Sequence, residues 1–348
     1  MKVSIGSKIV EGPWGGGNLF AINLSEYLLS NGDQVIYDLS DPDIDLILLT
    51  DPRNRSESSS TFNHIEIEKY LKYVNPNAVV VQRINECDER KNTNYVNKYL
   101  IYANRIADET IFVSSWLKNI YLDQGINSKV NHVVYAGADR KVFNNENFKP
   151  WVKKEKIKIT THHWGDNWNK GFESYIKIDG LIGTSKWSDI LEFTYIGNIP
   201  KKLEFNNSKI ISPLSGVALA NEIKKNNLYI TGSINEPSGN HHIEASQCGL
   251  PILYIDSGGI PEYCDGYGLK YTIDNLEKKL EEMITNYDQY AEAQKVYPNN
   301  SDKMSKQFLD IFNDAIKKKD LYSGERIKRF KQDPISKAFY MFKRKYFN

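Results

Sequence analysis

The sequence predicts an α/β fold in which two doubly wound parallel-sheet domains face each other across a cleft. Three observations support this prediction. Short apolar segments alternate with helical segments along most of the chain, as in sheets covered by helices on both faces. The chain has 348 residues, more than a single hydrophobic core usually holds. The alternation lapses once, at "NNENFKPWVKKEK" (144–156), where we place the linker.

The first domain (1–148) is expected to begin with the strand "KVSI", a glycine loop and a helix over 19–29 that ends at Asn31-Gly32. Further helices are predicted near 65–74, 94–105 and 115–123. The strands between them are read from apolar segments: "QVIYDL", "DLILLT", "AVVVQR", "TIFVS" and "HVVYAG".

The second domain (149–320) repeats the alternation, starting with the strand "IKITTHH" and a helix after Lys170. Helices follow near 217–226, around Glu244 and after Asp274, and residues 321–348 form a basic tail. The remaining strands are "LEFTYIG", "KIIS", "LYIT" and "PILYI". Open parallel sheets bind ligands at the carboxyl ends of their strands, so a cleft between two of them suits a two-part ligand.

Composition excludes several classes of protein. Hydrophobic residues make up 40% and charged residues 26% of the chain, which is ordinary for a soluble globular protein. No apolar run approaches the roughly 18 residues of a membrane span, and the first residues lack the apolar stretch of a signal peptide. Three scattered cysteines indicate a reducing compartment, so we expect a cytoplasmic protein.

The segment "NEPSGNHHIEASQCGLP" (235–251) places two glutamates eight positions apart. Pro237 and Gly239 make an unbroken helix through Glu236 unlikely to form, so Glu236 is expected in a loop and Glu244 one turn into the next helix. Two carboxylates around such a loop are arranged as in a ligand site.

Two other junctions between a strand and a helix have site-like sequences. In "GPWGGGN" (12–18) the glycines let the backbone approach a ligand and aim N–H groups at an anion. Phe20 stands where a dinucleotide fingerprint needs its last glycine, and no Gly-Lys-Ser/Thr follows as in a Walker loop. A flexible turn is the alternative interpretation.

In "HHWGDNWNKGF" (162–172), Lys170 puts a point charge near a helix start, where phosphate oxygens bind well. Trp164 and Trp168 can either stack on a ligand or pack against the protein, and we expect packing for at least one of them. Adjacent histidines cannot point the same way, so we predict no metal site at the two His-His pairs, and "DPDID" (41–45) is interpreted as a polar turn.

Taken in order, these pieces resemble the E-x7-E retaining glycosyltransferases of the GT-B fold (glycosyltransferase family 4-like) along nearly the whole chain. The similar pieces are "WGGGNLFAINLSEYLLSNGDQV", "ADETIFVSSWLKNIY", "VVYAGADRKVF", "NKGF" and "EPSGNHHIEASQCGLPILYIDSGGIPEYCDGYG". The resemblance implies two Rossmann-like domains and a retaining, metal-independent hexosyltransferase. It would move a sugar from a nucleoside-diphosphate sugar onto a glycan or lipid-linked acceptor in surface polysaccharide synthesis, with no cofactor and no nucleic-acid partner.

Two other functions remain open. One is a non-catalytic relative that binds sugar nucleotides or stabilises a partner. The other is an epimerase that acts on a UDP-sugar within the same two-domain fold.

The resemblance also assigns roles to residues. Glu236 would hold the donor sugar and Lys170 would stabilise the departing diphosphate, and these are the candidate catalytic residues. Glu244 would bind the ribose, and "SPLSG" would line the base pocket. The donor-binding candidates are Gly16, Gly17, His162, Pro213, Leu214, Ser238, Gly239, Asn240, Glu244, Gly258 and Gly259.

The chain departs from the family pattern at two places. The family commonly has an arginine five or six residues before the lysine, where this chain has Gly165 and Trp164. Neutralisation of the diphosphate is then either weaker or supplied by another residue such as His162 or Arg83. The family often has a histidine at the cleft end of a strand in the first domain. Arg83 and Asn85 are our candidates there, on the acceptor side.

The tail carries eleven Lys/Arg against three Asp/Glu between residues 317 and 348, a local charge of +8 in a chain of net charge +1. By the resemblance, it is expected to cross back onto the first domain. Residues 335–348 read as a basic amphipathic helix, expected both to dock there and to contact an anionic membrane weakly, at its inner face. The alternative is that its aromatic residues only dock while its lysines are solvated.

Overall fold

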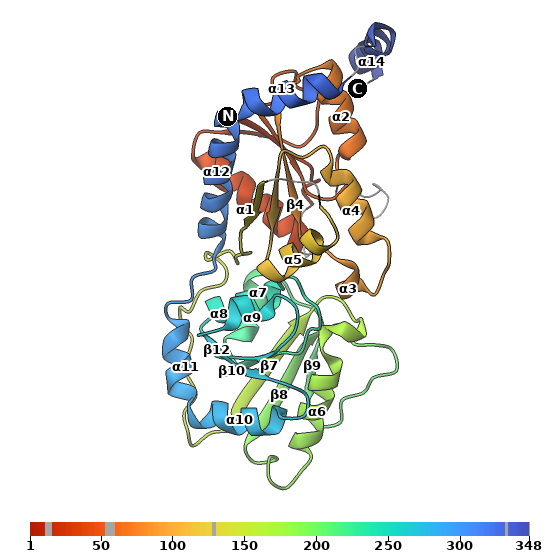
Figure 1. Ribbon diagram of the computed structural model, residues 1–348. Helices are drawn as coiled ribbons and strands as arrows, with labels where there is room; N and C mark the ends of the chain where they lie inside the picture. Colours follow the sequence, from red (N-terminus) through yellow and green to blue (C-terminus); the bar gives the residue numbers. More distant parts are fainter. Residues whose placement is uncertain (11–15, 53–59, 127–129, 331–332, 348) are drawn as a thin grey trace.

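Two six-stranded parallel sheets, each covered by helices, lie one above the other in the computed structural model (Figure 1). The structure describes residues 1–10, 16–52, 60–126, 130–330 and 333–347. None of the helices in these ranges is long and apolar enough to cross a membrane.

The first sheet has the strand order β2-β1-β3-β4-β5-β6. Its central strands are buried along their whole length, which explains why the sequence there is continuously apolar rather than alternating. The strands are β1 (Lys2–Ile5), β2 (Gln34–Ile36), β3 (Leu46–Leu49), β4 (Val79–Ile84), β5 (Glu109–Phe112) and β6 (Val130–Val133). The helices are α1 (Gly16–Ser30), α2 (His64–Tyr73), α3 (Asp88–Lys91), α4 (Val96–Asn104) and α5 (Ser115–Asp123).

The second sheet has the strand order β12-β11-β10-β7-β8-β9. The chain adds strands outward from β7 on one side and then outward from β10 on the other, so the strand order reverses between β7 and β10. Such a reversal leaves a crevice at the carboxyl ends of the two strands. The strands are β7 (Ile157–His163), β8 (Leu191–Gly197), β9 (Lys209–Ile211), β10 (Leu228–Thr231), β11 (Ile252–Ile255) and β12 (Gly268–Tyr271). The helices are the 3-10 turn η1 (Trp168–Lys170), α6 (Phe172–Ile182), α7 (Gly216–Ile223), α8 (Asn240–Gln247), α9 (Ile260–Cys264), α10 (Leu276–Thr285) and α11 (Tyr287–Gln294).

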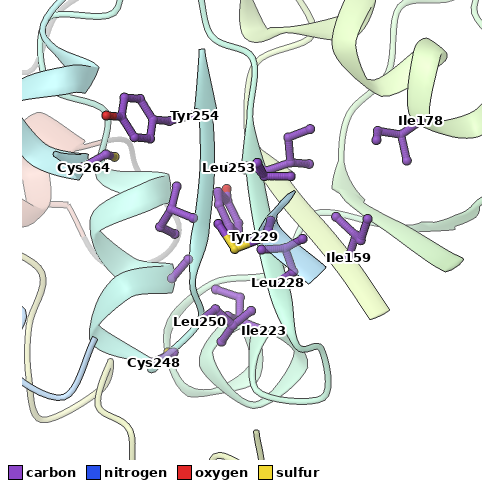
Figure 2. Close-up of a cluster of buried hydrophobic side chains, with 14 of the residues drawn as sticks. Ile159, Ile178, Ile223, Leu228, Tyr229, Cys248, Leu250, Leu253, Tyr254 and Cys264 are labelled. Atoms are coloured by element: carbon purple, nitrogen blue, oxygen red, sulfur yellow. The ribbon is translucent and has the colours of Figure 1, made fainter. Parts of the chain in front are cut away.

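A continuous hydrophobic core fixes the second sheet under its helices. Figure 2 shows part of it, where Ile159, Leu228 and Leu253 from three neighbouring strands pack with Ile178 from α6 and Ile223 from α7. All five side chains are fully buried. This rigid layer holds the loops at the carboxyl ends of β7 and β10 in place.

The chain returns to the first sheet through α12 (Ser301–Lys317), which runs beside α1 (Figure 1). Phe308 of α12 lies 5.1 Å from Phe20 of α1 between ring centroids, and Met304 and Phe312 belong to the same core. The return therefore begins about twenty residues before the boundary that we placed at residue 320. The packing of α12 therefore places it on the first domain, although along the chain it follows the second domain.

Two further helices complete the tail. Tyr322 of α13 (Lys319–Arg329) donates a 2.6 Å hydrogen bond to the Glu109 carboxylate of β5, and Arg326 pairs with Asp108. The last helix, α14 (Pro334–Phe347), projects at the end of the molecule beside α2 (Figure 1).

The segment "DPDID" forms a turn that precedes β3, at the amino edge of the first sheet. Lys2 pairs with Asp41 at 2.8 Å and with Asp43 at 2.6 Å, so the two carboxylates already have a cation partner. Within the described residues, no group of three or more His, Cys, Asp or Glu is placed to hold a metal ion.

Candidate active site

The loops that follow β7 and β10 meet at the point where the second sheet reverses. Lys170 ends η1 in the first loop, and Glu236 lies in the second, with 2.8 Å between Lys170 Nζ and Glu236 Oε2. Gly171 makes this approach possible: a Cβ there would lie 2.5 Å from the backbone of Gly232, and its φ of +100° suits only glycine well. The two residues predicted to be catalytic are therefore in direct contact.

The backbone of Glu236 is held by the loop that precedes α9. The amide of Gly259 donates to the Glu236 carbonyl at 2.9 Å, and the amide of Asn235 donates to Ser257 Oγ at 2.9 Å. A Cβ on Gly258 would lie 2.6 Å from the Glu236 backbone. The structure thus places the predicted residues Gly258 and Gly259 against Glu236, where they fix its position.

Arg90, which the sequence analysis did not select, also reaches Glu236. It lies on α3 of the first domain, and its Nε is 3.0 Å from Glu236 Oε1. Its Nη1 pairs with Glu86. The one available signal was its place in "QRINECDER" (82–90), the segment from which we selected only Arg83 and Asn85.

Glu236 is 5% exposed, yet its two cation partners keep it ionised. Burial by itself would raise the pKa of its carboxyl, but the charges of Lys170 and Arg90 outweigh burial and hold the pKa well below the usual range. In turn, the Glu236 carboxylate raises the pKa of the Arg90 guanidinium.

Glu244 sits on the second turn of α8 and contacts His162 at the end of β7. His162 Nε2 is 2.8 Å from Glu244 Oε2, and the His162 amide donates to Tyr229 Oη at 3.0 Å. Among the described residues, Glu244 Oε1 has no hydrogen-bond partner. The histidine therefore orients the carboxylate and leaves one oxygen for a ligand.

The helices α1 and α8 begin side by side across the two domains. A Cβ on Gly16 would lie 2.8 Å from the side-chain amide of Asn240, whereas one on Gly17 would meet nothing within 4 Å. Ser238, which is half-buried, and Gly239, which is buried, precede α8 directly. The starts of two helices thus lie next to each other, where negative charge is favoured.

Pro213 and Leu214 lie farther along the same carboxyl edge, after the edge strand β9 and before α7. Both are half-buried, and Leu214 packs against the core of the second domain. Among the described residues, no hydrogen bond joins them to Glu236 or Glu244.

Arg83 lies next to the last residue of β4 in the first domain and is 6% exposed. Its guanidinium lies 3.9 Å from the ring centroid of Phe20, and among the described residues it has no carboxylate or hydrogen-bond partner. Burial lowers the pKa of this guanidinium to about 10. Arg83 and Asn85 line one small pocket together with Thr50, Asp51, Ile84, Glu86 and Leu100.

Both tryptophans of the lysine loop are largely exposed. Trp164 is 57% exposed and Trp168 is 55% exposed. Trp168 only approaches Phe172, at 6.2 Å between ring centroids. Packing is therefore limited to this ring contact of Trp168 at the surface, and neither tryptophan is buried.

Three other histidines lie buried under the site. His163 Nε2 is 2.6 Å from Tyr175 Oη, and His241 Nε2 is 2.8 Å from Thr231 Oγ1. Neither ring nitrogen of His242 has a partner among the described residues. Burial lowers the pKa of His242 to about 3 and those of His163 and His241 well below their usual value, so all three rings are neutral.

Comparison with known proteins gives two findings. Residues 195–304, which include Glu236 and Glu244, match the family model described as "Glycosyl transferases group 1". A search among curated proteins gives no match.

Solved structures resemble the chain over most of its length. A glycosyltransferase from Rickettsia africae is 15% identical, with a TM-score of 0.66, and the match covers 91% of this chain and 98% of that one. HepE of Anabaena, in complex with UDP and glucose, is 13% identical with a TM-score of 0.64 and coverage of 90% and 100%. Sucrose-phosphate synthase of Thermosynechococcus elongatus is 14% identical with a TM-score of 0.60 and coverage of 90% and 98%.

The fold is GT-B.

In this GT-B fold, α9 of the second domain bonds to the first domain. Glu262 accepts hydrogen bonds of 2.7 Å from the amides of Ser115 and Trp116, the first residues of α5, and one of 3.1 Å from Tyr135. The amide of Ala136 donates to the hydroxyl of Tyr263 at 3.0 Å. The two domains are therefore joined by a charged cap on a helix start.

Proposed function

We propose that the chain is a retaining glycosyltransferase that moves a hexose-type sugar from a nucleoside-diphosphate sugar onto a glycan or lipid-linked acceptor in surface polysaccharide synthesis. The observation that carries the proposal is the 2.8 Å ion pair between Lys170 and Glu236 at the reversal point of a GT-B donor sheet. The family match of residues 195–304 supports the same conclusion.

The proposed chemistry follows from where charge develops. Transfer breaks the bond between the anomeric carbon and the diphosphate, so negative charge grows on the departing phosphate. Lys170 and the amides at the start of α8 are fixed beforehand and stabilise that charge. Glu236 holds hydroxyl groups of the sugar and keeps the ring oriented during the reaction.

The rest of the donor lies along the same edge of the sheet. Glu244 Oε1 accepts hydrogen bonds from the ribose, while His162 holds Oε2. Pro213 and Leu214 form a wall of the base pocket. HepE, which shares the fold, is described in complex with UDP-glucose, so UDP-sugars are the first donors to test.

We assign the acceptor to the pocket at the end of β4, where Arg83 and Asn85 line the wall. A buried guanidinium without a carboxylate partner favours an acceptor or sugar that brings acceptor oxygens or negative charge to it.

A panel of UDP-, GDP- and ADP-sugars tests the proposal. Wild-type protein should hydrolyse one donor slowly, and the sugar should first appear as the anomer that the donor contained, which nuclear magnetic resonance detects. Inverted product would exclude retention. Binding without turnover, with or without acceptors, would instead favour a non-catalytic sugar-nucleotide-binding subunit.

We also propose that the reaction needs no metal ion or cofactor, because lysine and helix amides serve the diphosphate. Turnover should be unchanged in excess EDTA. Loss of activity that manganese restores would overturn this part of the proposal.

We further propose a cytoplasmic protein that contacts the inner face of an anionic membrane through α14. On this helix Ile335, Phe339 and Phe342, spaced on one face, are 84%, 71% and 57% exposed, and Lys337 and Lys343 are exposed beside them. The docked face is a different one. Tyr340 lies 5.4 Å from Tyr73, and Arg344 lies over Tyr70 and donates to the carbonyl of Ser40.

Ile335, Lys337, Phe339 and Lys343 thus stay exposed while the helix is docked. Each basic residue near an anionic surface contributes about 1 kcal/mol, enough for weak and salt-sensitive binding. Wild-type protein should sediment with anionic vesicles and not with neutral ones. Equal sedimentation with both, or no change after Phe339→Ser with Phe342→Ser, would contradict the membrane contact.

A further inference from the structure

We propose that Arg90 of the first domain is the second cation of the donor diphosphate site, so that the site is complete only while the two domains are closed on each other. The inference rests on the proposed function. It assigns to α3 a role that sequence similarity in the second domain does not cover, because the family match begins at residue 195.

The contacts of α3 place Arg90 between the two donor loops. The side-chain amide of Asn235, after β10, donates to the Glu89 carbonyl at 3.2 Å. The side-chain amide of Asn169, after β7, donates to the Arg90 carbonyl at 3.2 Å. Both loops that carry the candidate catalytic residues therefore also hold the backbone of α3.

The Glu236 carboxylate divides its oxygens between two cations. Arg90 takes Oε1 and Lys170 takes Oε2, so the two positive charges are separated by a single carboxylate. A nucleotide sugar carries a negative charge on each of its two phosphates. Lys170 matches one of them, and Gly165 and Trp164 supply no charge in the second domain.

Arg90 also has a side-chain nitrogen that can donate to a ligand. Its Nη1 is held by Glu86 and its Nε by Glu236, whereas Nη2 has no partner among the described residues. A guanidinium presents its donors as a planar fork that suits phosphate oxygens. Arg90 can therefore donate a hydrogen bond from Nη2 to a phosphate oxygen without giving up the carboxylates that position it.

The arrangement links donor binding to domain closure. Arg90 lies in the first domain, whereas Lys170 and Glu236 lie in the second, so opening the cleft would remove one of the two cations. A ligand that binds the closed arrangement more tightly shifts the population toward it.

Calorimetric titration of four proteins tests the role of Arg90: wild type, Arg90→Ala, Glu236→Gln and the double variant. UDP and UMP are the probes, followed by GDP and GMP. Arg90→Ala should weaken UDP binding by about 10- to 100-fold, the range of one charge-assisted hydrogen bond, and UMP binding by no more than about threefold. Lys91→Ala is the matched control, because Lys91 pairs with Glu86 from the same helix, and it should bind UDP like wild type.

The double variant separates two explanations. If Arg90 binds the diphosphate, Arg90→Ala should still weaken UDP binding in the Glu236→Gln background. If Arg90 only neutralises Glu236, the substitution should have no effect there, and the inference is overturned. Equal losses for UDP and UMP would also overturn it. Wild-type protein that binds none of these nucleotides would instead reject the proposed function together with the inference.

Discussion

Glu236 and Glu244 differ at the residue scale in what surrounds their carboxylates. Glu236 is held between two cations, whereas Glu244 is oriented by one histidine and keeps one oxygen without a partner among the described residues. The first arrangement suits a group that acts on developing charge and sugar orientation. The second suits a ribose contact that is equal in the ground and transition states.

This difference predicts a kinetic separation. Glu236→Ala should lower kcat, because it removes the group that orients the reacting sugar. Glu244→Ala should chiefly raise the KM for the donor, because uniform binding does not change kcat. Steady-state kinetics with the identified donor measure both effects. If both substitutions raise only KM, the assignment of separate roles is wrong.

Lys170→Ala should reduce transition-state stabilisation by roughly 2–4 kcal/mol, the effect of losing one preorganised donor to a developing oxyanion. The reduction should appear in kcat/KM. Lys177→Ala is a suitable control, because Lys177 on α6 donates to the Ile273 carbonyl away from the site. A loss below about fivefold, or about 1 kcal/mol, would remove Lys170 from the catalytic role.

At the scale of elements, the start of α5 depends on a carboxylate from the other domain. Glu262 accepts two amide hydrogen bonds there, and α5 has no acidic residue of its own in the first turn. Charge at a helix start and its hydrogen bonds are each worth up to about 2 kcal/mol in partly buried geometry.

Glu262→Gln should therefore lower the free energy of unfolding by about 1–2 kcal/mol in urea denaturation. Glu292→Gln is the matched control: Glu292 is 70% exposed in a pair with Lys295, and its loss should change stability by less than about 0.5 kcal/mol. Equal effects of the two substitutions would show that the cap between the domains does not stabilise the fold.

Much of the element order could be predicted from the sequence, because it is encoded locally. The strands β1, β7, β8 and β10 occupy the predicted residues "KVSI", "IKITTHH", "LEFTYIG" and "LYIT". Apolar runs bounded by turns are sufficient for such buried parallel strands. The short elements α3, α9 and β12 were not predicted, since four or five residues carry little periodicity.

The candidate site was predicted in part for the same reason. Lys170 and Glu236 lie in loops between a strand and a helix and Glu244 lies in the helix that follows, so local sequence indicates their places. Arg90 reaches Glu236 through a contact between domains that no local pattern encodes. The position of α12 was misjudged likewise, because its amphipathic sequence does not say which of the two domains it covers.

At the scale of the whole molecule, the buried histidines should make stability depend on pH. Burial lowers the pKa of His242 from 6.5 in the unfolded chain to about 3, and His163 and His241 shift in the same direction. Between these values the unfolded chain binds protons that the folded protein does not. The contribution of the three neutral histidines to the free energy of unfolding is therefore fully present above about pH 6.5 and is lost as the pH falls below this value.

The free energy of unfolding should thus fall by roughly 1 kcal/mol per histidine between pH 7 and pH 5.5. His242→Leu should make this fall in the free energy of unfolding smaller by roughly 1 kcal/mol, the contribution of one histidine. At pH 7 the variant should be as stable as wild type or more so, since neither nitrogen has a partner among the described residues. Denaturation curves at both pH values measure this, and an unchanged pH dependence would contradict the assignment.

We propose above all that the loops after β7 and β10 form the donor site of a glycosyltransferase. The most direct measurement is a crystal structure of the protein soaked with UDP, or with the nucleoside diphosphate that binds most tightly. We expect a ribose on Glu244 and a diphosphate beside Lys170 and the start of α8. A nucleotide bound elsewhere, or at this edge with its phosphates turned away from Lys170, would contradict it.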